Sequence, residues 1–185
     1  LCADFAIRDT GFGELFPAAD VFIIDEAHQL PEVASNFFGT VLSSRQLMEL
    51  VTDTTTEYHR DIGDLPKILD QLEKLKKSVL DLRLAFGTTQ RREAWVMIED
   101  DNKIQEAFDQ TEIELDVLKG MLEVIKGRSK GIDACLARCE TTLEIITTLR
   151  QPEEPDEVIR WFEVFGQSVR WNSTPIDIAK LFGSQ

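Results

Sequence analysis

Cysteine and histidine are scarce in this 185-residue sequence, with three and two residues respectively. An odd number of cysteines, two of them only four positions apart, does not predict a disulfide framework, and a reducing cytoplasm fits them better. No apolar run approaches the length of a membrane span, and no signal peptide is visible. Because the sequence begins at Leu1 and not at methionine, we expect a soluble piece of a longer protein.

Basic residues are outnumbered by acidic ones, 20 against 34, which gives a formal net charge of −14. Broad, sequence-independent binding to DNA needs lysine and arginine for the phosphates, so this balance argues against it. Three local basic clusters could still contact a DNA backbone: Lys74/Lys76/Lys77, Arg91/Arg92 and Arg128/Lys130. For each cluster we favour a solvated face that is balanced by nearby acids.

A phosphate-binding loop is also missing. An ATPase of the P-loop type needs a Gly-rich run that ends in Gly-Lys-Ser/Thr, and no such run occurs in the sequence. Residues 127–131 (GRSKG) lack both the spacing and a preceding strand, so we interpret them as a turn between helices. A nucleotide site formed by this chain alone would therefore be incomplete.

The stretch that is present and most informative is Val21-Phe22-Ile23-Ile24-Asp25-Glu26-Ala27-His28. Four apolar residues that run into two carboxylates are typical of a buried strand of a parallel α/β sheet, whose ligands lie beyond the carboxyl ends of the strands. The chemistry that fits is phosphoryl transfer, with Mg²⁺ held by Asp25, in part through water, and water activated by Glu26. The competing interpretation is a buried strand that ends in a solvated acidic turn.

The motif and its flanks resemble a known family. Asp25-Glu26-Ala27-His28 after an apolar strand is similar to motif II of superfamily 2 helicases, and LCADFAIR with FPAADVFIIDEAHQLPEVA is similar to their XPD-like DinG/YoaA branch. The similarity is best over residues 1–45 and returns weakly at residues 174–179. The resemblance implies a DNA helicase of the bacterial cytoplasm that couples ATP hydrolysis to movement along single-stranded or forked DNA in repair or replication.

The resemblance also implies roles and missing parts. Asp25 would hold Mg²⁺, Glu26 would activate water, and His28 with Gln29 would link the nucleotide to the DNA-binding parts. The phosphate loop would lie upstream and the second motor domain downstream, so the piece alone should not hydrolyse ATP. The family commonly carries a 4Fe-4S cluster, but on cysteines before motif II, so none of the three cysteines here is assigned to it. Which residues contact DNA is left open.

The rest of the chain predicts a mainly α fold, a helical bundle with a few short strands from an incomplete motor domain and a small β-hairpin. Apolar residues recur at spacings of three and four over residues 65–86, 102–126 and 132–146, which predicts three long helices. A shorter helix is expected from about residue 45 to 55 after a Ser43 or Ser44 cap, and a hairpin over residues 158–171. Asn102 is the expected cap of the second long helix, and Thr174 that of a final short helix. Loops are expected over residues 52–63 and 88–93, and a strand or a tucked aromatic segment over residues 95–98. We divide the chain into motor fragment (1–42), arch-like helical domain (43–155) and return segment (156–185).

Several expectations concern single residues and neighbours. Cys135 and Cys139 share a helix face, and buried packing is favoured over metal ligation. Trp95, Trp161 and Trp171 could stack on bases, but packing in the core or on the hairpin is favoured. The strand that contains Phe22 would lack its sheet neighbours, so we expect it to self-associate with another copy, to repack on the bundle or to be disordered. The alternative function is an acidic helical module that docks a protein partner without ATPase activity, either instead of a helicase or as the arch within one.

Overall fold

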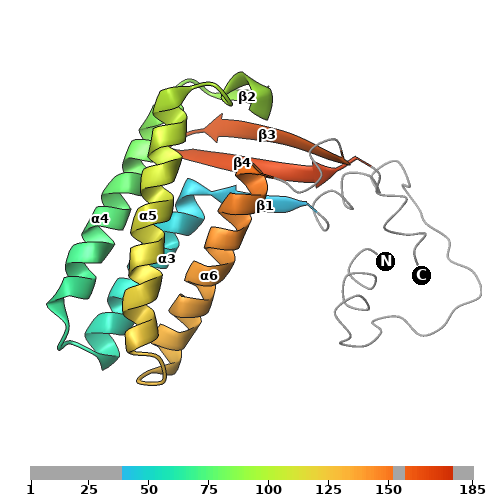
Figure 1. Cartoon of the computed structure of the whole chain (residues 1–185). Coiled ribbons are helices and arrows are strands. Elements are labelled where there is room, and N and C mark those ends of the chain that lie inside the picture. Colours follow the sequence, from blue (N-terminus) through green and yellow to red (C-terminus); the bar gives the residue numbers. More distant parts are fainter. Residues whose placement is uncertain (1–38, 152–156, 177–185) are drawn as a thin grey trace, which may run out of the picture.

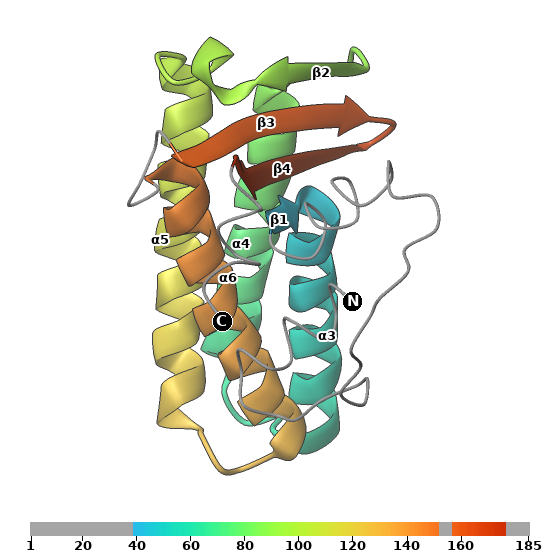
Figure 2. The same cartoon turned by 90° about the vertical axis from the view of Figure 1, so that its right-hand side faces the viewer.

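The computed structural model describes residues 39–151 and 157–176. The elements of these residues follow in the order β1 (Thr40–Ser43), α3 (Ser44–Asp61), α4 (Pro66–Ala85), β2 (Arg91–Ala94), the short 3₁₀ helix η2 (Trp95–Met97), α5 (Asn102–Val124), α6 (Lys130–Arg150), β3 (Val158–Phe165) and β4 (Ser168–Pro175). Figures 1 and 2 show the four long helices running side by side, with the sheet across one end of the bundle. Within the described part of the chain, the mainly α prediction is confirmed.

The helices form where the periodic apolar residues predict them, and capping residues set their ends. Ser43 caps α3 by accepting a hydrogen bond from the Gln46 N–H at 3.2 Å. Pro66 is the first residue of α4, where its missing N–H costs no hydrogen bond. Asp101 caps α5, one residue before the predicted Asn102, by accepting from the Ile104 N–H. None of the helices in the described ranges has the length and apolarity that a membrane span requires.

The four strands of the described residues form one antiparallel sheet in the order β1-β4-β3-β2. The predicted hairpin is confirmed as β3 and β4, which are joined at Gly166, whose φ of +54° suits a residue without a Cβ. On one face of the sheet Phe162 lies beside Trp171, and both are buried against the helices. The sheet and the bundle therefore share a core.

Aromatic rings join the two layers. Phe86, at the end of α4, lies 5.0 Å from Phe162 and 5.8 Å from Trp171 between ring centroids. Phe108 of α5 lies 5.2 Å from Trp171 and 5.8 Å from Trp95. Edge-to-face and tilted pairs at these distances add to the burial of large apolar surfaces. The hairpin is therefore part of the core that the helices form.

The predicted loop at residues 52–63 is wrong for most of its length, because α3 continues to Asp61. The polar threonines that suggested a loop bond to their own helix: Thr54 and Thr55 donate to the carbonyls of Leu50 and Val51 at 2.7 and 2.8 Å. Tyr58 is buried one turn later and accepts a hydrogen bond from the Leu65 N–H. Burial on one face of the helix outweighs the weak helix propensity of threonine.

Two further predictions need correction, and a third is decided between its alternatives. The predicted loop at residues 88–93 ends in β2, since Arg91 and Arg92 pair with Val164 and Glu163 of β3. Residues 95–98 form no strand: Trp95 begins η2 and is buried, which confirms the alternative of a tucked aromatic segment. The predicted helix start at Thr174 is also wrong, because β4 extends to Pro175.

Candidate functional site

The predicted catalytic residues Asp25, Glu26, His28 and Gln29 lie outside the described residues. Their roles therefore remain predictions from the sequence. The structure describes the helical body that follows them in the chain, residues 39–151 and 157–176.

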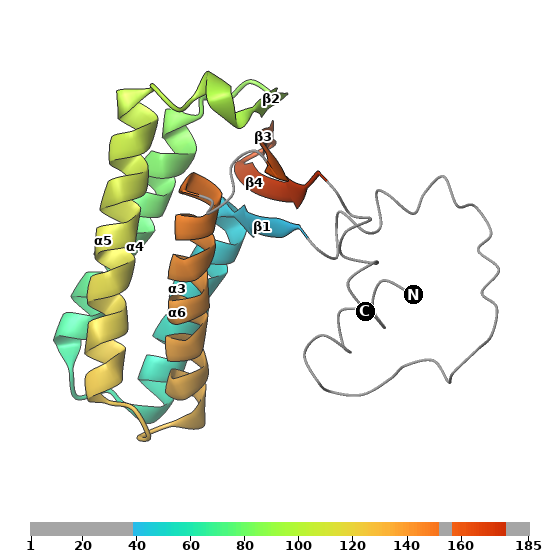
Figure 3. The same ribbon diagram turned by 45° about the vertical axis from the view of Figure 1, so that its right-hand side comes forward.

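The chain enters the described body at the start of β1 and leaves it at the end of β4, and these two strand ends are neighbours. Thr40, the first residue of β1, pairs with Ser173 near the end of β4, and Val158 pairs with Pro175. The Ile176 N–H donates to the Glu157 carbonyl at 2.8 Å, just beyond these pairs. Figure 3 shows β1, β4 and β3 together at one side of the bundle. Entry and exit points this close are typical of a domain inserted into another one.

The basic clusters that could have contacted DNA are balanced by acids. Arg128 forms an ion pair with Asp64 at 3.0 Å, Lys76 with Glu73 at 3.5 Å, and Arg91 with Glu93 at 3.7 Å. Exposed pairs of this kind contribute little to stability, but they reduce the positive potential that attracts a phosphate backbone. The acids expected beside these three positions are present, and the preference for solvated faces over DNA contact stays a prediction.

The three tryptophans pack as expected. Trp95 and Trp171 are buried in the core. Trp161 lies on the opposite face of β3 from Phe162, and the guanidinium of Arg92 lies 3.6 Å from the centre of its ring. The Arg92–Trp161 stack was not predicted from the sequence, because β2 was expected to be a loop.

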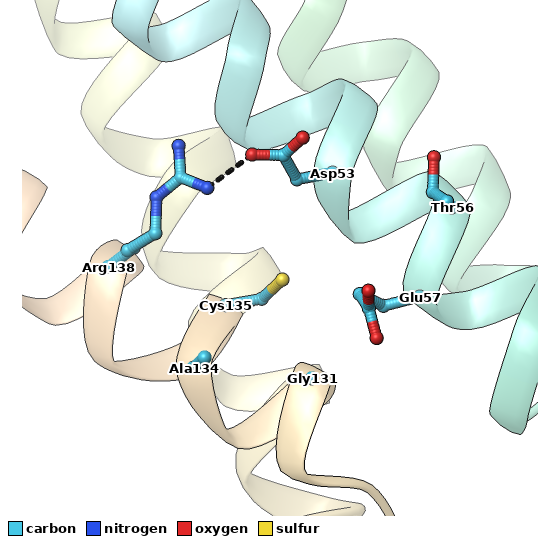
Figure 4. Close-up of a pocket in the computed structure, with 7 residues that line it drawn as sticks. All are labelled: Asp53, Thr56, Glu57, Gly131, Ala134, Cys135 and Arg138. Carbon is cyan, nitrogen blue, oxygen red and sulfur yellow. Dashed lines mark hydrogen bonds and ion pairs between the residues drawn. The ribbon is translucent and has the colours of Figure 1, made fainter.

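Cys135 of α6 faces α3 across a hollow of about 240 Å³, and the Arg138–Asp53 ion pair joins the two helices at 2.5 Å. Figure 4 shows Cys135 and this ion pair between the two helices. Burial raises the pKa of the Cys135 thiol, and it raises that of Cys139 to about 12. Both thiols are therefore neutral at ordinary pH, which disfavours metal binding and nucleophilic chemistry.

The prediction of buried packing for these cysteines is confirmed. Within the described ranges, no group of three or more His, Cys, Asp or Glu residues is arranged to hold a metal ion. The hollow is therefore a packing feature in which Arg138 pairs with Asp53 and Arg60 pairs with Glu57, and no site for an ion follows from it.

The comparisons with known proteins agree with the motif. No family model matches the chain. The chain is 34% identical over 186 residues to ATP-dependent DNA helicase YoaA of Haemophilus influenzae, a match that covers 99% of the chain. It is 33% identical to ATP-dependent DNA helicase YoaA of Escherichia coli over 97% of its length. The chain spans only 29% and 28% of these two relatives. The predicted resemblance is thus confirmed: over almost its whole length, the chain is related to one segment of the YoaA-type DNA helicases.

Proposed function

We propose that the chain is a part of an ATP-dependent DNA helicase that moves along single-stranded or forked DNA in repair or replication. The observation that carries the proposal is the match of nearly the whole chain to two proteins that are both named as ATP-dependent DNA helicases. The sequence Asp25-Glu26-Ala27-His28 after an apolar run supplies the chemical reason. A cytoplasmic location follows from DNA as the substrate.

The proposed organisation is a motor fragment (residues 1–42), a helical arch (43–155) and a return segment (156–185). The neighbouring ends of β1 and β4 support it, because an inserted domain must leave and rejoin its host at nearby points. The charge balance of the helices supports a structural arch and not a broad DNA-binding surface. The hairpin shares the core of the helices, so the return to the motor would follow β4.

In the proposed mechanism, the Asp25 carboxylate would hold Mg²⁺ in part through water, and the Glu26 carboxylate would accept the proton of the attacking water. When bound, Mg²⁺ would neutralise charge on the phosphate oxygens of ATP. His28 and Gln29 follow in the sequence and would connect this site to the DNA-binding parts. The sequence contains no Gly-Lys-Ser/Thr run, so the 185-residue chain alone should be inactive.

An iron–sulfur cluster in the full-length protein would need cysteines other than Cys135 and Cys139. The thiol of Cys139 is fully buried, and both thiols are held neutral by burial, whereas cluster ligands are thiolates. We therefore assign no cluster ligand in the described residues.

The test is the ATPase activity of the full-length protein with single-stranded DNA, wild type against Glu26→Gln. Loss of the water-activating carboxylate should lower turnover by at least about a hundredfold while MgATP still binds. Glu73→Gln is the matched control, because Glu73 is an exposed carboxylate on α4 and should leave turnover unchanged. An unchanged rate in Glu26→Gln, or no ATPase activity in the wild type, would instead support the acidic interaction module.

A further inference from the structure

Helix α5 carries apolar residues on two opposite faces. The inner face packs in the core through Phe108, Leu115, Leu118 and Leu122. On the outer face Ile113, Val117 and Val124 are 55%, 41% and 84% exposed. Together with Gly120 they recur at spacings of four, three and four, so they form one line along the helix, which we name the α5 stripe. In Figure 1, α5 lies between α4 and α6 at the front of the bundle.

Gly120 makes the middle of the α5 stripe hollow. A Cβ at this position would meet no atom within 4 Å, so no neighbouring group in the fold requires the glycine. Glycine inside a helix costs about 1 kcal/mol relative to alanine. The distance between packed helices depends on the side chains at their contact, so a glycine between Val117 and Val124 lets a second helix approach closely.

One edge of the α5 stripe is acidic. Asp109, Asp116 and Glu123 follow at intervals of seven residues, and all three are exposed. Lys119 lies among them and pairs with Asp116 at 3.2 Å. Asp116, with smaller effects of Glu123 and Glu140, raises the pKa of Lys119. Asp109 pairs with Arg150 at 2.7 Å. The carboxylates of this edge outnumber the cations that contact them.

We propose that the α5 stripe binds an amphipathic helix of a partner protein that carries lysine or arginine along one edge. The stripe covers eleven helical steps, or roughly 17 Å, which corresponds to about three turns of the partner. Apolar residues of the partner would cover Ile113, Val117 and Val124, and its basic edge would face Asp109, Asp116 and Glu123. This is the groove-and-anchor mode of helix recognition.

The charges decide between this partner and two others. In a twofold antiparallel pair of α5 helices, the acidic edge would face its own copy, and like charges at an interface oppose association. A nucleic acid would place phosphates against the same carboxylates. Of these three occupants, a basic amphipathic helix alone matches both the apolar α5 stripe and its acidic edge. The inference does not depend on ATP hydrolysis, and it can fail while the proposed helicase activity holds.

The test uses the 185-residue chain and a labelled helical peptide of about 14 residues. The peptide has leucines at the spacing of the α5 stripe and lysines along one edge, and fluorescence anisotropy measures its binding. Ile113→Glu should weaken binding at least about tenfold. The substitution adds negative charge, so a merely nonspecific attraction to the lysines would instead become stronger. Gly120→Trp fills the hollow and should weaken binding to the same extent. Leu84→Glu is the matched control: Leu84 is 60% exposed on α4, and its replacement should leave binding unchanged.

A peptide with glutamate in place of lysine should bind at least about tenfold more weakly. Circular dichroism of each variant checks that the helices are retained. Equal binding of both peptides, or equal loss in Leu84→Glu and Ile113→Glu, would overturn the proposal. So would a concentration-dependent dimer of the wild type that Gly120→Trp disperses, because a second copy would then be the occupant.

Discussion

Cys139 shows what burial does to a single ionisable side chain. Its thiol lies on α6, inside the hydrophobic core. Burial raises the pKa of this thiol from 9.0 to about 12, with a smaller effect of Cys135. An unfolded chain would lose this proton near pH 9, whereas the folded chain keeps it. The neutral thiol therefore favours the folded state fully below pH 9, and this contribution is lost as the pH rises from about 9 to about 12.

The Cys139→Ala variant should lack this loss. We expect the difference in the free energy of unfolding between wild type and variant to be constant up to about pH 8.5. Above that it should shrink by roughly 1 kcal/mol per pH unit. Urea unfolding at a series of pH values measures the difference. A difference that stays constant to pH 11 would show that the Cys139 thiol is not held neutral.

At the residue scale, the position of a side chain on one face of a helix or strand predicted whether it is buried. Cys135 and Cys139 were assigned to buried packing because they fall on or beside an apolar stripe, and both are buried. Packing in the core or on the hairpin was favoured for Trp95 and Trp171, and both are buried too. The Arg92–Trp161 stack could not be predicted, since it depends on the register of two strands that are far apart in the sequence. Asp25 and Glu26 remain predictions from a motif and from relatives.

At the scale of elements, Arg150 ties the end of α6 to α5. Its guanidinium pairs with Glu112 and with Asp109, donates to Gln105 and lies 5.4 Å from the centre of the Phe108 ring. Burial raises the pKa of Glu112, and Arg150 partly offsets this effect. Removal of the cation would leave a half-buried carboxylate without its partner, which costs more than the loss of a surface pair.

We therefore expect Arg150→Met to lower the free energy of unfolding by about 2 kcal/mol at neutral pH, measured by urea denaturation. Arg138→Met on the same helix is the control, because it removes the exposed pair with Asp53 and should cost less than about 1 kcal/mol. Equal losses in the two variants would mean that Arg150 acts as an ordinary surface residue.

The elements that were predicted correctly are those with a strong apolar period. Helices α4, α5 and α6 follow from spacings of three and four, and the β3–β4 hairpin from its apolar strands around a glycine. The second half of α3 was missed because its threonines satisfy their hydroxyls within the helix. Strand β2 was missed because its first three residues, Arg91, Arg92 and Glu93, are charged, and its partner β3 supplies the apolar contacts.

For the whole molecule, one core links elements from both ends of the described chain. Leu42 of β1 lies in the same core as Phe162 and Trp171 of the hairpin, together with the apolar faces of the helices between them. The long-range pairing of β4 with β1 encloses the four long helices of the described residues, and the pairing of β2 with β3 encloses α5 and α6. This arrangement suits a body that is attached to a motor through strand ends and carries its own stability. The helicase proposal requires such a body.

The residues from 39 to 176 should therefore fold without residues 1–38. We expect the shortened chain to unfold in one cooperative urea transition, because the core that the described residues form lies within it. Loss of the hairpin as well should prevent folding. Phe162 and Trp171 each contribute about 3–5 kcal/mol, which together approaches the total stability of a domain. A broad transition without a baseline in residues 39–176 would show that the core depends on the first segment.

The same pair of chains tests the proposed self-association through residues 21–24. The strand predicted before Asp25 would lack the sheet of a complete motor domain, so its edges would pair with those of another copy. Sedimentation should detect association of the 185-residue chain that increases with concentration, whereas residues 39–176 should remain monomeric. Association that persists after residues 1–38 are removed would assign it to the helical body, and Ile113→Glu would then show whether the α5 stripe is responsible.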